Sequence, residues 1–354
     1  MNENISCMLI RGGTSKGAYF LASDLPESEQ ERDDLLVRIM GSGEGQQING
    51  IGGGTTLTSK VAIVSKSKQE GTDLDYLFAQ VAVDKKEVDT KPSCGNILSG
   101  IVAFASENNL VKLSSPSTML RVRNINTNTI IEVSAESPNG HLRYDGDVRV
   151  DGVPGTGSPV LLNFLDVGGS KTGKLFPTGN VRDQIEGVEV SCLDAAVPMV
   201  HVNAKDLGLA GNETKQQLDD NAELLERIES IRLSAGRLMG MGDVTGSVVP
   251  KVSLLSPPTQ DGHITSRYFV PQNCHASHAV TGGICVAAAC MIPGTVAHEV
   301  CQGISSETVI IEHPSGQIQV NIKVEPGELE PAVRQAALVR TARPLFKGQV
   351  YPTF

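Results

Sequence analysis

The sequence repeats itself at a nearly constant offset, and this limits the folds open to it. Four short segments of the first half recur in the second half in the same order. They align Cys7 with Cys192, Asp24 with Asp206, Arg38 with Arg237, and Lys60 with Lys251, at offsets of 185, 182, 199 and 191 residues. Chance can supply one such match, whereas four in register indicate two halves of similar structure. We therefore predict an N-terminal half of residues 1–186 and a C-terminal half of residues 187–354, with a crossing back of the chain at its termini left open.

Each half has the same order of expected elements. Two apolar strands lead to an amphipathic helix, which in the second half spans residues 221–240 with Leu224, Ile228 and Ile231 on one face. A glycine turn and a further strand, "KVAIVS" or "KVSLLS", follow. This order predicts a mixed α/β architecture in both halves.

A short helix that is apolar on all sides is expected later in each half. The two segments are residues 94–105 and 281–290, and a helix without a polar face is buried. Residues 118–150 and 308–324 alternate in the manner of strands. The predicted fold is therefore α/β (α+β): two pseudo-symmetric halves, each with strands wrapped around a buried central helix, and an active site in the cleft between them.

Composition excludes several classes of function. The formal net charge of the 354 residues is −10, which argues against a sequence-independent grip on nucleic acid or an anionic membrane. The first residues lack the pattern of a signal peptide, and no apolar run reaches the ~18 residues that span a bilayer. Seven cysteines without a CxxC pair favour free thiols in a reducing compartment. We expect a cytoplasmic protein; the sequence leaves its oligomeric state open, with a homodimer as one option.

Both central helices begin with small residues. The first turn of a helix leaves N–H groups unpaired and carries about +0.5 charge, so it attracts anions. Two such helix starts facing one ligand would suit a di- or tricarboxylate. The residues predicted to contact it are Gly95, Asn96, Thr281, Gly282 and Gly283.

Cys94 precedes the first of these helices, where a helix N-terminus favours a thiolate. Most other cysteines lie in apolar strand or helix interiors and are interpreted as small buried hydrophobes. The position corresponding to Cys94 in the second half is Ala279, so no two-thiol arrangement is expected.

Two other segments carry partial binding motifs, one of glycines before a lysine and one of cysteine and histidines. The glycine-rich stretch 49–60 is not a phosphate loop, because Ser59 stands where that motif has a glycine and Lys60 leads into a strand. Cys274, His275 and His278 have a loose metal-like spacing, but no second cluster completes four ligands, so no metal site is predicted. His275 either lines the ligand cleft or is an ordinary loop histidine. Arg267 likewise reaches the cleft or is a strand-edge cation.

Five motifs together resemble a known family. They are "RGGTSKGAYF", "GIGGGTTLTSKVAIV", "CGNILSGIVAFA", "GDVRVDGVPGTGSPV" and "AVTGGICVAA". In this order they resemble the PrpF-like isomerases, which include 4-oxalomesaconate tautomerase, 2-methylaconitate isomerase and 2-methylitaconate isomerase and have the diaminopimelate epimerase fold. The resemblance extends from Ser6 to Tyr351, and its finer features are closest to the 4-oxalomesaconate branch.

The resemblance implies a cofactor-independent isomerase that shifts a proton, by keto-enol or allylic 1,3-transfer, on an unsaturated polycarboxylate. Lys60 and Cys94 match the family's catalytic positions, and which of them is the base stays open. The remaining expected substrate contacts are Arg11, Thr14, Ser15, Lys16, Gly53, Gly54 and Ser59.

Alternatives to 4-oxalomesaconate remain open. Within the family, the substrate could be 2-methylaconitate or 2-methylitaconate, and Ala276 stands where relatives tend to carry a basic residue, which affects substrate selection. Outside it, a non-catalytic carboxylate-binding accessory protein is the rival, although such a protein would not need both Lys60 and Cys94.

Overall fold

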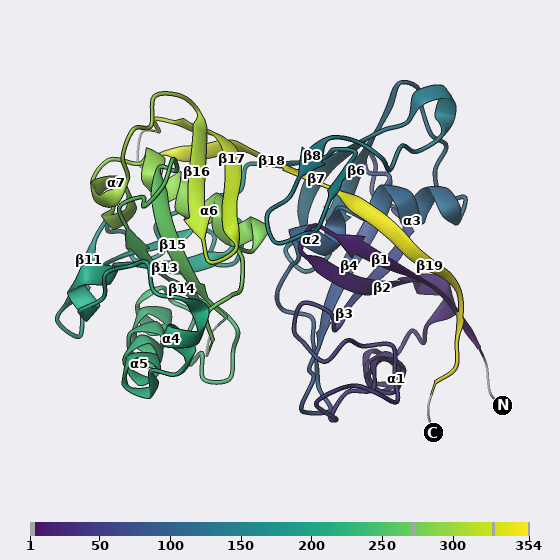
Figure 1. The fold of residues 1–354 in the computed structure, drawn as a ribbon, viewed down its shortest axis with the longest axis horizontal. Coiled ribbons are helices and arrows are strands. Elements are labelled where there is room, and N and C mark those ends of the chain that lie inside the picture. The colour runs from purple at the N-terminus through teal and green to yellow at the C-terminus, as the bar shows by residue number, and fades with distance from the viewer. Residues whose placement is uncertain (1–3, 271–272, 328–329, 353–354) are drawn as a thin grey trace. The chain divides into compact units, whose positions relative to one another are not determined.

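The structure is a computed structural model that describes residues 4–270, 273–327 and 330–352. The chain divides into two compact units, one of Met1–Leu162 with Val339–Phe354 and one of Asn163–Leu338 (Figure 1). Compared with the predicted halves, residues 163–186 lie in the second unit and residues 339–354 in the first.

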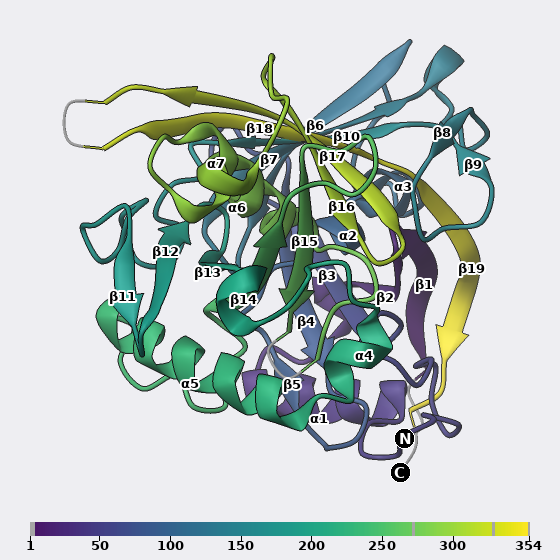
Figure 2. The same ribbon diagram turned by 60° about the vertical axis from the view of Figure 1, so that its left-hand side comes forward.

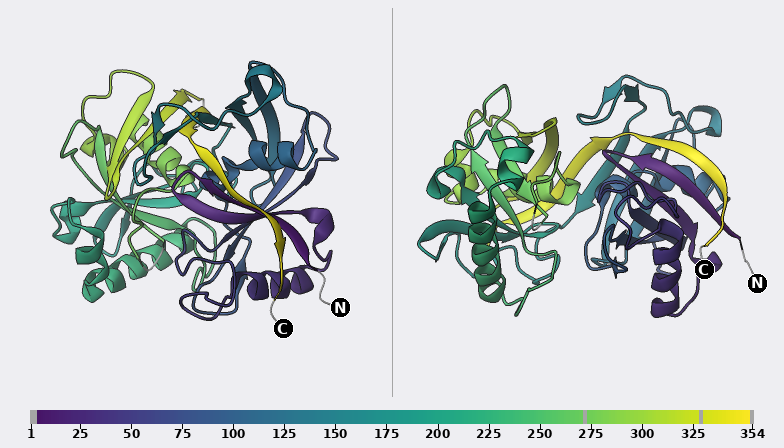
Figure 3. Two further views of the ribbon diagram at one scale, coloured as in Figure 1. Left: turned by 45° about the vertical axis from the view of Figure 1, so that its right-hand side comes forward. Right: turned by 60° about the horizontal axis from the view of Figure 1, so that its bottom comes forward.

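A mixed sheet forms the framework of the first unit. In pairing order its strands are β19 (Ala342–Val350), β1 (Ile5–Gly12), β2 (Ser15–Leu21), β3 (Lys60–Lys66), β4 (Leu74–Val81), β6 (Ser117–Asn124) and β7 (Thr129–Glu136). The pairs β2–β3 and β4–β6 are parallel and the others antiparallel. The short β5 (Val88–Asp89) extends the end of β4. Figure 3 shows β19, from the end of the chain, running alongside β1.

The second unit has a sheet of the same kind. Its strands pair in the order β11 (Asp183–Ile185), β12 (Val188–Asp194), β13 (Pro198–Asn203), β14 (Lys251–Ser256), β15 (Ile264–Phe269), β16 (Thr308–His313), β17 (Gly316–Glu325) and β18 (Ala332–Arg340). Here β13–β14 and β15–β16 are the parallel pairs. From β12 to β17 the succession of parallel and antiparallel pairs is that of β1 to β7.

The four sequence matches fall in corresponding elements of the two units. Cys7 and Cys192 lie in β1 and β12, Asp24 and Asp206 in η1 (Ala22–Asp24) and η3 (Ala204–Leu207), Arg38 and Arg237 in α1 (Glu29–Met40) and α5 (Ala222–Leu238), and Lys60 and Lys251 open β3 and β14. The sequence repeat thus follows a repeat in the order of the elements.

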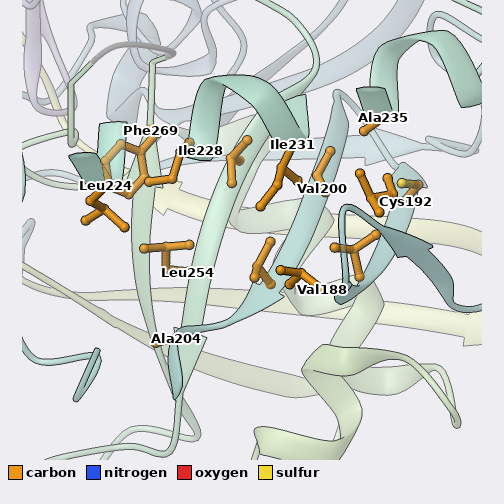
Figure 4. Close-up of a cluster of buried hydrophobic side chains, with 14 of the residues drawn as sticks. Val188, Cys192, Val200, Ala204, Leu224, Ile228, Ile231, Ala235, Leu254 and Phe269 are labelled. Carbon is orange, nitrogen blue, oxygen red and sulfur yellow. The ribbon is translucent and has the colours of Figure 1, made fainter. Parts of the chain in front are cut away.

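One face of each sheet is covered by the amphipathic helix. In the second unit, α5 contacts β11 and β14 (Figure 2). Its Leu224, Ile228 and Ile231 pack against strand residues that include Leu254 and Phe269 (Figure 4). Leu36 and Ile39 of α1 form the matching cluster in the first unit. Ser28 and Asn221 cap the two helices by accepting hydrogen bonds from backbone N–H groups.

The apolar helices lie against the other face. In the second unit, α6 (Val280–Met291) is buried from Val280 to Cys290 and contacts β12, β13, β16 and β17. In the first unit the segment predicted as one helix is split at Ser99–Gly100 into α2 (Gly95–Leu98) and α3 (Ile101–Glu107). Tyr19 of β2 packs here: a Cβ on Gly100 would lie 2.4 Å from its hydroxyl, so only glycine fits.

The remaining elements are short. They are η2 (Pro138–Gly140), α4 (Lys215–Asp219), α7 (Val296–Val300), β8 (Val148–Arg149), β9 (Thr156–Gly157) and β10 (Val160–Leu165). The predicted strand region 118–150 is therefore two paired strands, β6 and β7, followed by largely irregular chain.

Candidate active site

Lys60 opens β3 and is 9% exposed. Its Nζ donates a hydrogen bond to Oε1 of Gln80 at 2.7 Å and lies 5.1 Å from the centroid of the Phe78 ring. Burial lowers the pKa of the Lys60 ammonium, and the nearby Cys94 thiol group acts in the opposite direction. A lysine so placed is closer to the neutral amine that a proton-transfer base requires.

Gln80 holds the amine of Lys60 in place. Its Nε2 donates to the carbonyls of Ser59 at 2.8 Å and Thr56 at 3.2 Å, so its Oε1 is turned toward Lys60. Ser59 is in turn bound through its hydroxyl by Nε2 of Gln47 at 2.7 Å. The residue that sequence reasoning missed here is Gln80, which stands opposite Lys60 in the β3–β4 register.

The glycine-rich loop before Lys60 is tied to the same network. The N–H of Gly54 donates to Oε1 of Gln47 at 3.0 Å, and Gly54 has a φ of +69°. A Cβ on Gly53 would lie 2.5 Å from Oγ1 of Thr58. The two glycines, which the sequence analysis expects to contact the substrate, are therefore also required by the tight loop itself.

Cys94 is the N-cap residue of α2 and is partly exposed. Its carbonyl accepts hydrogen bonds from the hydroxyl of Tyr76 at 3.0 Å and from the N–H of Leu98 at 3.0 Å. Tyr76, Phe78 and Gln80 alternate along β4 and share the face toward α2, whereas Ala79 and Val81 belong to the cluster on α1. The structure thus brings Lys60 and Cys94 together on this face.

The turn between β1 and β2 is pressed against Asn96. A Cβ on Gly12 would lie 2.2 Å from the carbonyl oxygen of Asn96, and one on Gly13 would lie 2.2 Å from its Oδ1. The Nδ2 of Asn96 donates to Oγ1 of Thr14 at 3.0 Å. Gly95 and Asn96 are both buried. Predicted contacts from two distant motifs therefore meet at one place.

Two of the expected substrate contacts, Arg11 and Lys16, are cations, and their surroundings differ. Nη1 of Arg11 donates to Oγ1 of Thr341 at 2.7 Å, and burial, with a smaller effect of Arg343, lowers the pKa of Arg11. Lys16 is partly buried, and its backbone N–H donates to the carbonyl of Leu57 at 2.9 Å.

A second residue that sequence reasoning missed is Arg340, at the end of β18. It is 6% exposed, and its Nε donates to Oδ1 of Asn96 at 3.2 Å. The two residues are 244 positions apart, so no local motif links them. The available signal was the alternation of the strand: Arg340 lies two and four residues after Leu338 and Ala336, on the same buried face.

In the second unit, Thr281, Gly282 and Gly283 form the first turn of α6, after the N-cap residue Ala279. A Cβ on Gly282 would lie 2.5 Å from the ring of Tyr268, which explains the glycine by packing.

The histidines before α6 are held by local hydrogen bonds. His275 accepts the N–H of Ser277 on Nδ1 at 3.0 Å, and its ring centroid lies 5.9 Å from that of Tyr268. His278, 2% exposed, pairs its Nε2 with the hydroxyl of Ser266 at 3.0 Å.

Arg267 lies on the other face of β15. Ser266 and Tyr268 face α6, while Phe269 packs with α5, so the alternation of the strand turns Arg267 toward the α4–α5 side. Its Nε donates to the carbonyl of Glu213 at 2.7 Å, and it lines a cavity of about 510 Å³ with residues such as Lys215 and Glu312. The structure does not bring Arg267 together with Thr281 and Gly282.

Residues 4–270, 273–327 and 330–352 contain no group of three or more His, Cys, Asp or Glu side chains that could hold a metal ion. None of the helices formed by these residues is both long and apolar enough to cross a membrane.

Comparison with known proteins agrees with the fold and the motifs. Residues 2–353 match the family described as PrpF protein. The chain is 49% identical to YbhH of Escherichia coli strain K12, whose name assigns no substrate, with 99% of each chain covered. It is 46% identical to the 4-oxalomesaconate tautomerase of Pseudomonas putida (98% and 95% covered) and 44% identical to the (4E)-oxalomesaconate Delta-isomerase of Novosphingobium sp. strain KA1 (99% and 98%).

Solved structures show the same relationship. The crystal structure of a methylitaconate-delta-isomerase matches with a TM-score of 0.82 at 36% identity, over 99% of this chain and 96% of that one. A hydroxyproline epimerase from Agrobacterium vitis matches with a TM-score of 0.60 at 12% identity, over 98% and 92% of the chains. The protein therefore has an epimerase-like α/β fold and is an isomerase. It belongs to the PrpF family.

Proposed function

We propose that this isomerase shifts a proton within an unsaturated polycarboxylate, without a cofactor, and that 4-oxalomesaconate is its substrate. The observation that carries the proposal is the buried amine of Lys60, fixed by Gln80 and close to the thiol of Cys94. Two relatives at 46% and 44% identity are named for oxalomesaconate, which supports this substrate over others.

The chemistry requires one base and one acid. A C–H bond next to a carbonyl or carboxylate and conjugated with a C=C bond breaks as one group takes the proton. The electron pair then forms a dienolate, and the other group returns a proton at the far end of the conjugated system, so that the double bond moves. Lys60 and Cys94 fill these two roles, and the pH dependence of kcat/KM distinguishes which of them is the base.

Hydrogen-bond donors are needed where negative charge develops. The first unit offers three such groups around the β1–β2 turn and the start of α2: the buried Nδ2 of Asn96, the hydroxyl of Thr14 and the hydroxyl of Ser15. Preorganised donors of this kind stabilise an enolate without reorganising during the reaction.

A second candidate substrate is methylitaconate, because a methylitaconate-delta-isomerase shares the fold at a TM-score of 0.82. The experiment is proton exchange in D₂O, followed by NMR, with 4-oxalomesaconate, 2-methylaconitate and 3-methylitaconate after treatment of the protein with EDTA and desalting. We expect the highest kcat/KM with 4-oxalomesaconate and no loss of rate on EDTA treatment. A higher value with another member reassigns the substrate, and exchange with none of them favours the accessory protein.

A further inference from the structure

Arg340 is a buried cation that has no acidic partner within the part of the chain that the structure describes. It is 6% exposed, and among the described residues its guanidinium bonds only neutral acceptors, Oδ1 of Asn96 at 3.2 Å and the carbonyl of Val339 at 2.8 Å. Burial lowers the pKa of Arg340 to about 10, so it is still charged at neutral pH. A buried charge is normally compensated by an opposite charge.

None of the described groups beside Arg340 supplies that charge, and burial alone accounts for its lowered pKa. The side chain of Arg340 lies against the β1–β2 turn, since a Cβ on Gly13 would lie 3.1 Å from its Cδ. That turn continues into Arg11 on one side and Lys16 on the other, both cationic. The first unit therefore gathers positive charge here.

A buried hydroxyl beside the same turn also lacks a hydrogen-bond partner in the described ranges. Ser15 is 3% exposed, and its Oγ makes no hydrogen bond among the described residues. Ser15 shares the face of β2 with Gly17 and Tyr19, which contact α2, so its hydroxyl lies on the side of Asn96. An unsatisfied hydroxyl and an uncompensated guanidinium in one place point to a ligand that accepts hydrogen bonds and carries negative charge.

We infer that Arg340 binds a carboxylate group of the substrate, with Ser15 as a second donor to the same anionic ligand. The inference rests on the proposed function for the identity of the ligand as a polycarboxylate. Asn96 holds Nε and the carbonyl of Val339 holds one N–H of Nη1, which leaves Nη2 and the other N–H of Nη1 to the carboxylate. Arginine suits this role because its planar fork matches carboxylate geometry.

The test measures binding rather than turnover. The probe is tricarballylate, a saturated tricarboxylate that has no double bond to move, titrated calorimetrically into the wild type and Arg340→Gln. We expect its Kd to rise about 30-fold in Arg340→Gln. The matched control is Arg343→Gln, an exposed arginine three residues on, for which we expect a change within about twofold.

Lysine substitution separates charge from shape. Arg340→Lys keeps the charge and most of the packing but loses the fork, so its Kd should rise about tenfold. It also serves as the test if Arg340→Gln fails to unfold cooperatively. Binding of either folded variant as tight as that of the wild type overturns the inference and leaves the proposed function untouched.

The two proposals fail separately. A wild type that binds no tricarballylate at millimolar concentration overturns the inference, whatever its activity. Binding that depends on Arg340, combined with no proton exchange on any substrate of the panel, supports the inference and overturns the proposed isomerisation of polycarboxylates.

Discussion

The same position in the two units carries different chemistry. Lys60 and Lys251 each open the third strand of their repeat, and Cys94 and Ala279 are each the N-cap residue of a central helix with extended backbone angles. The scaffold is thus kept, while a thiol stands at this N-cap position in the first unit only. The comparison teaches that a repeated fold does not imply a repeated reactive group, and under the proposed function proton transfer belongs to the first unit.

The largest effect is expected at Lys60. Lys60→Ala removes the amine and should lower kcat about 10³-fold, because general acid–base groups contribute roughly 10²- to 10⁴-fold. Lys251→Ala should lower kcat less than tenfold, although it also removes a buried lysine. Steady-state kinetics with both variants decides, and equal losses would break the distinction between the units.

The thiol gives the next test. Cys94→Ala should lower kcat about 10²- to 10³-fold for the same reason. Moving the thiol to the matching N-cap, in the double variant Cys94→Ala with Ala279→Cys, should restore none of this loss. Recovery of activity in the double variant would show that the units are interchangeable at this position.

The amphipathic helices should behave alike. Ile39 in α1 and Ile228 in α5 are each 1% exposed in the corresponding cluster. Each Ile→Ala change should lower the free energy of unfolding by about 2–5 kcal/mol, and urea denaturation measures it. A much smaller loss at one of them would show that the repeat does not extend to packing.

The smallest effect concerns the pH profile. Gln80→Glu places a carboxylate on the Lys60 ammonium, which favours the charged form and raises the pKa of Lys60, against the lowering by burial. The limb of the kcat/KM profile that reports Lys60 should therefore move about one pH unit higher. If the limb that shifts is the one on which kcat/KM rises with pH, Lys60 is the base; if it is the one on which kcat/KM falls, Lys60 is the acid. If neither limb shifts in Gln80→Glu, Gln80 does not position Lys60.

Sequence reasoning captured what depends on local pattern. The strand–helix order, the amphipathic α5 and the buried α6 follow from periodicity, and Lys60, Cys94 and Asn96 lie in recognisable motifs. It could not find Gln80 or Arg340, because a strand register and a contact across 244 residues are set by tertiary packing. It left the role of Arg267 open, because the side of β15 on which that residue lies depends on the register of the whole sheet.

The pairing of β19 with β1 has a consequence for biogenesis. Ile5 stands opposite Val350, so the sheet that carries Lys60 is finished only by a strand synthesised after the entire second unit. Arg340 and Thr341 arrive with that strand. During translation the second unit can fold as a continuous segment, whereas the first must wait with an open sheet edge beside β1. The surroundings of Lys60 and Asn96 are therefore completed only after the second unit has been synthesised.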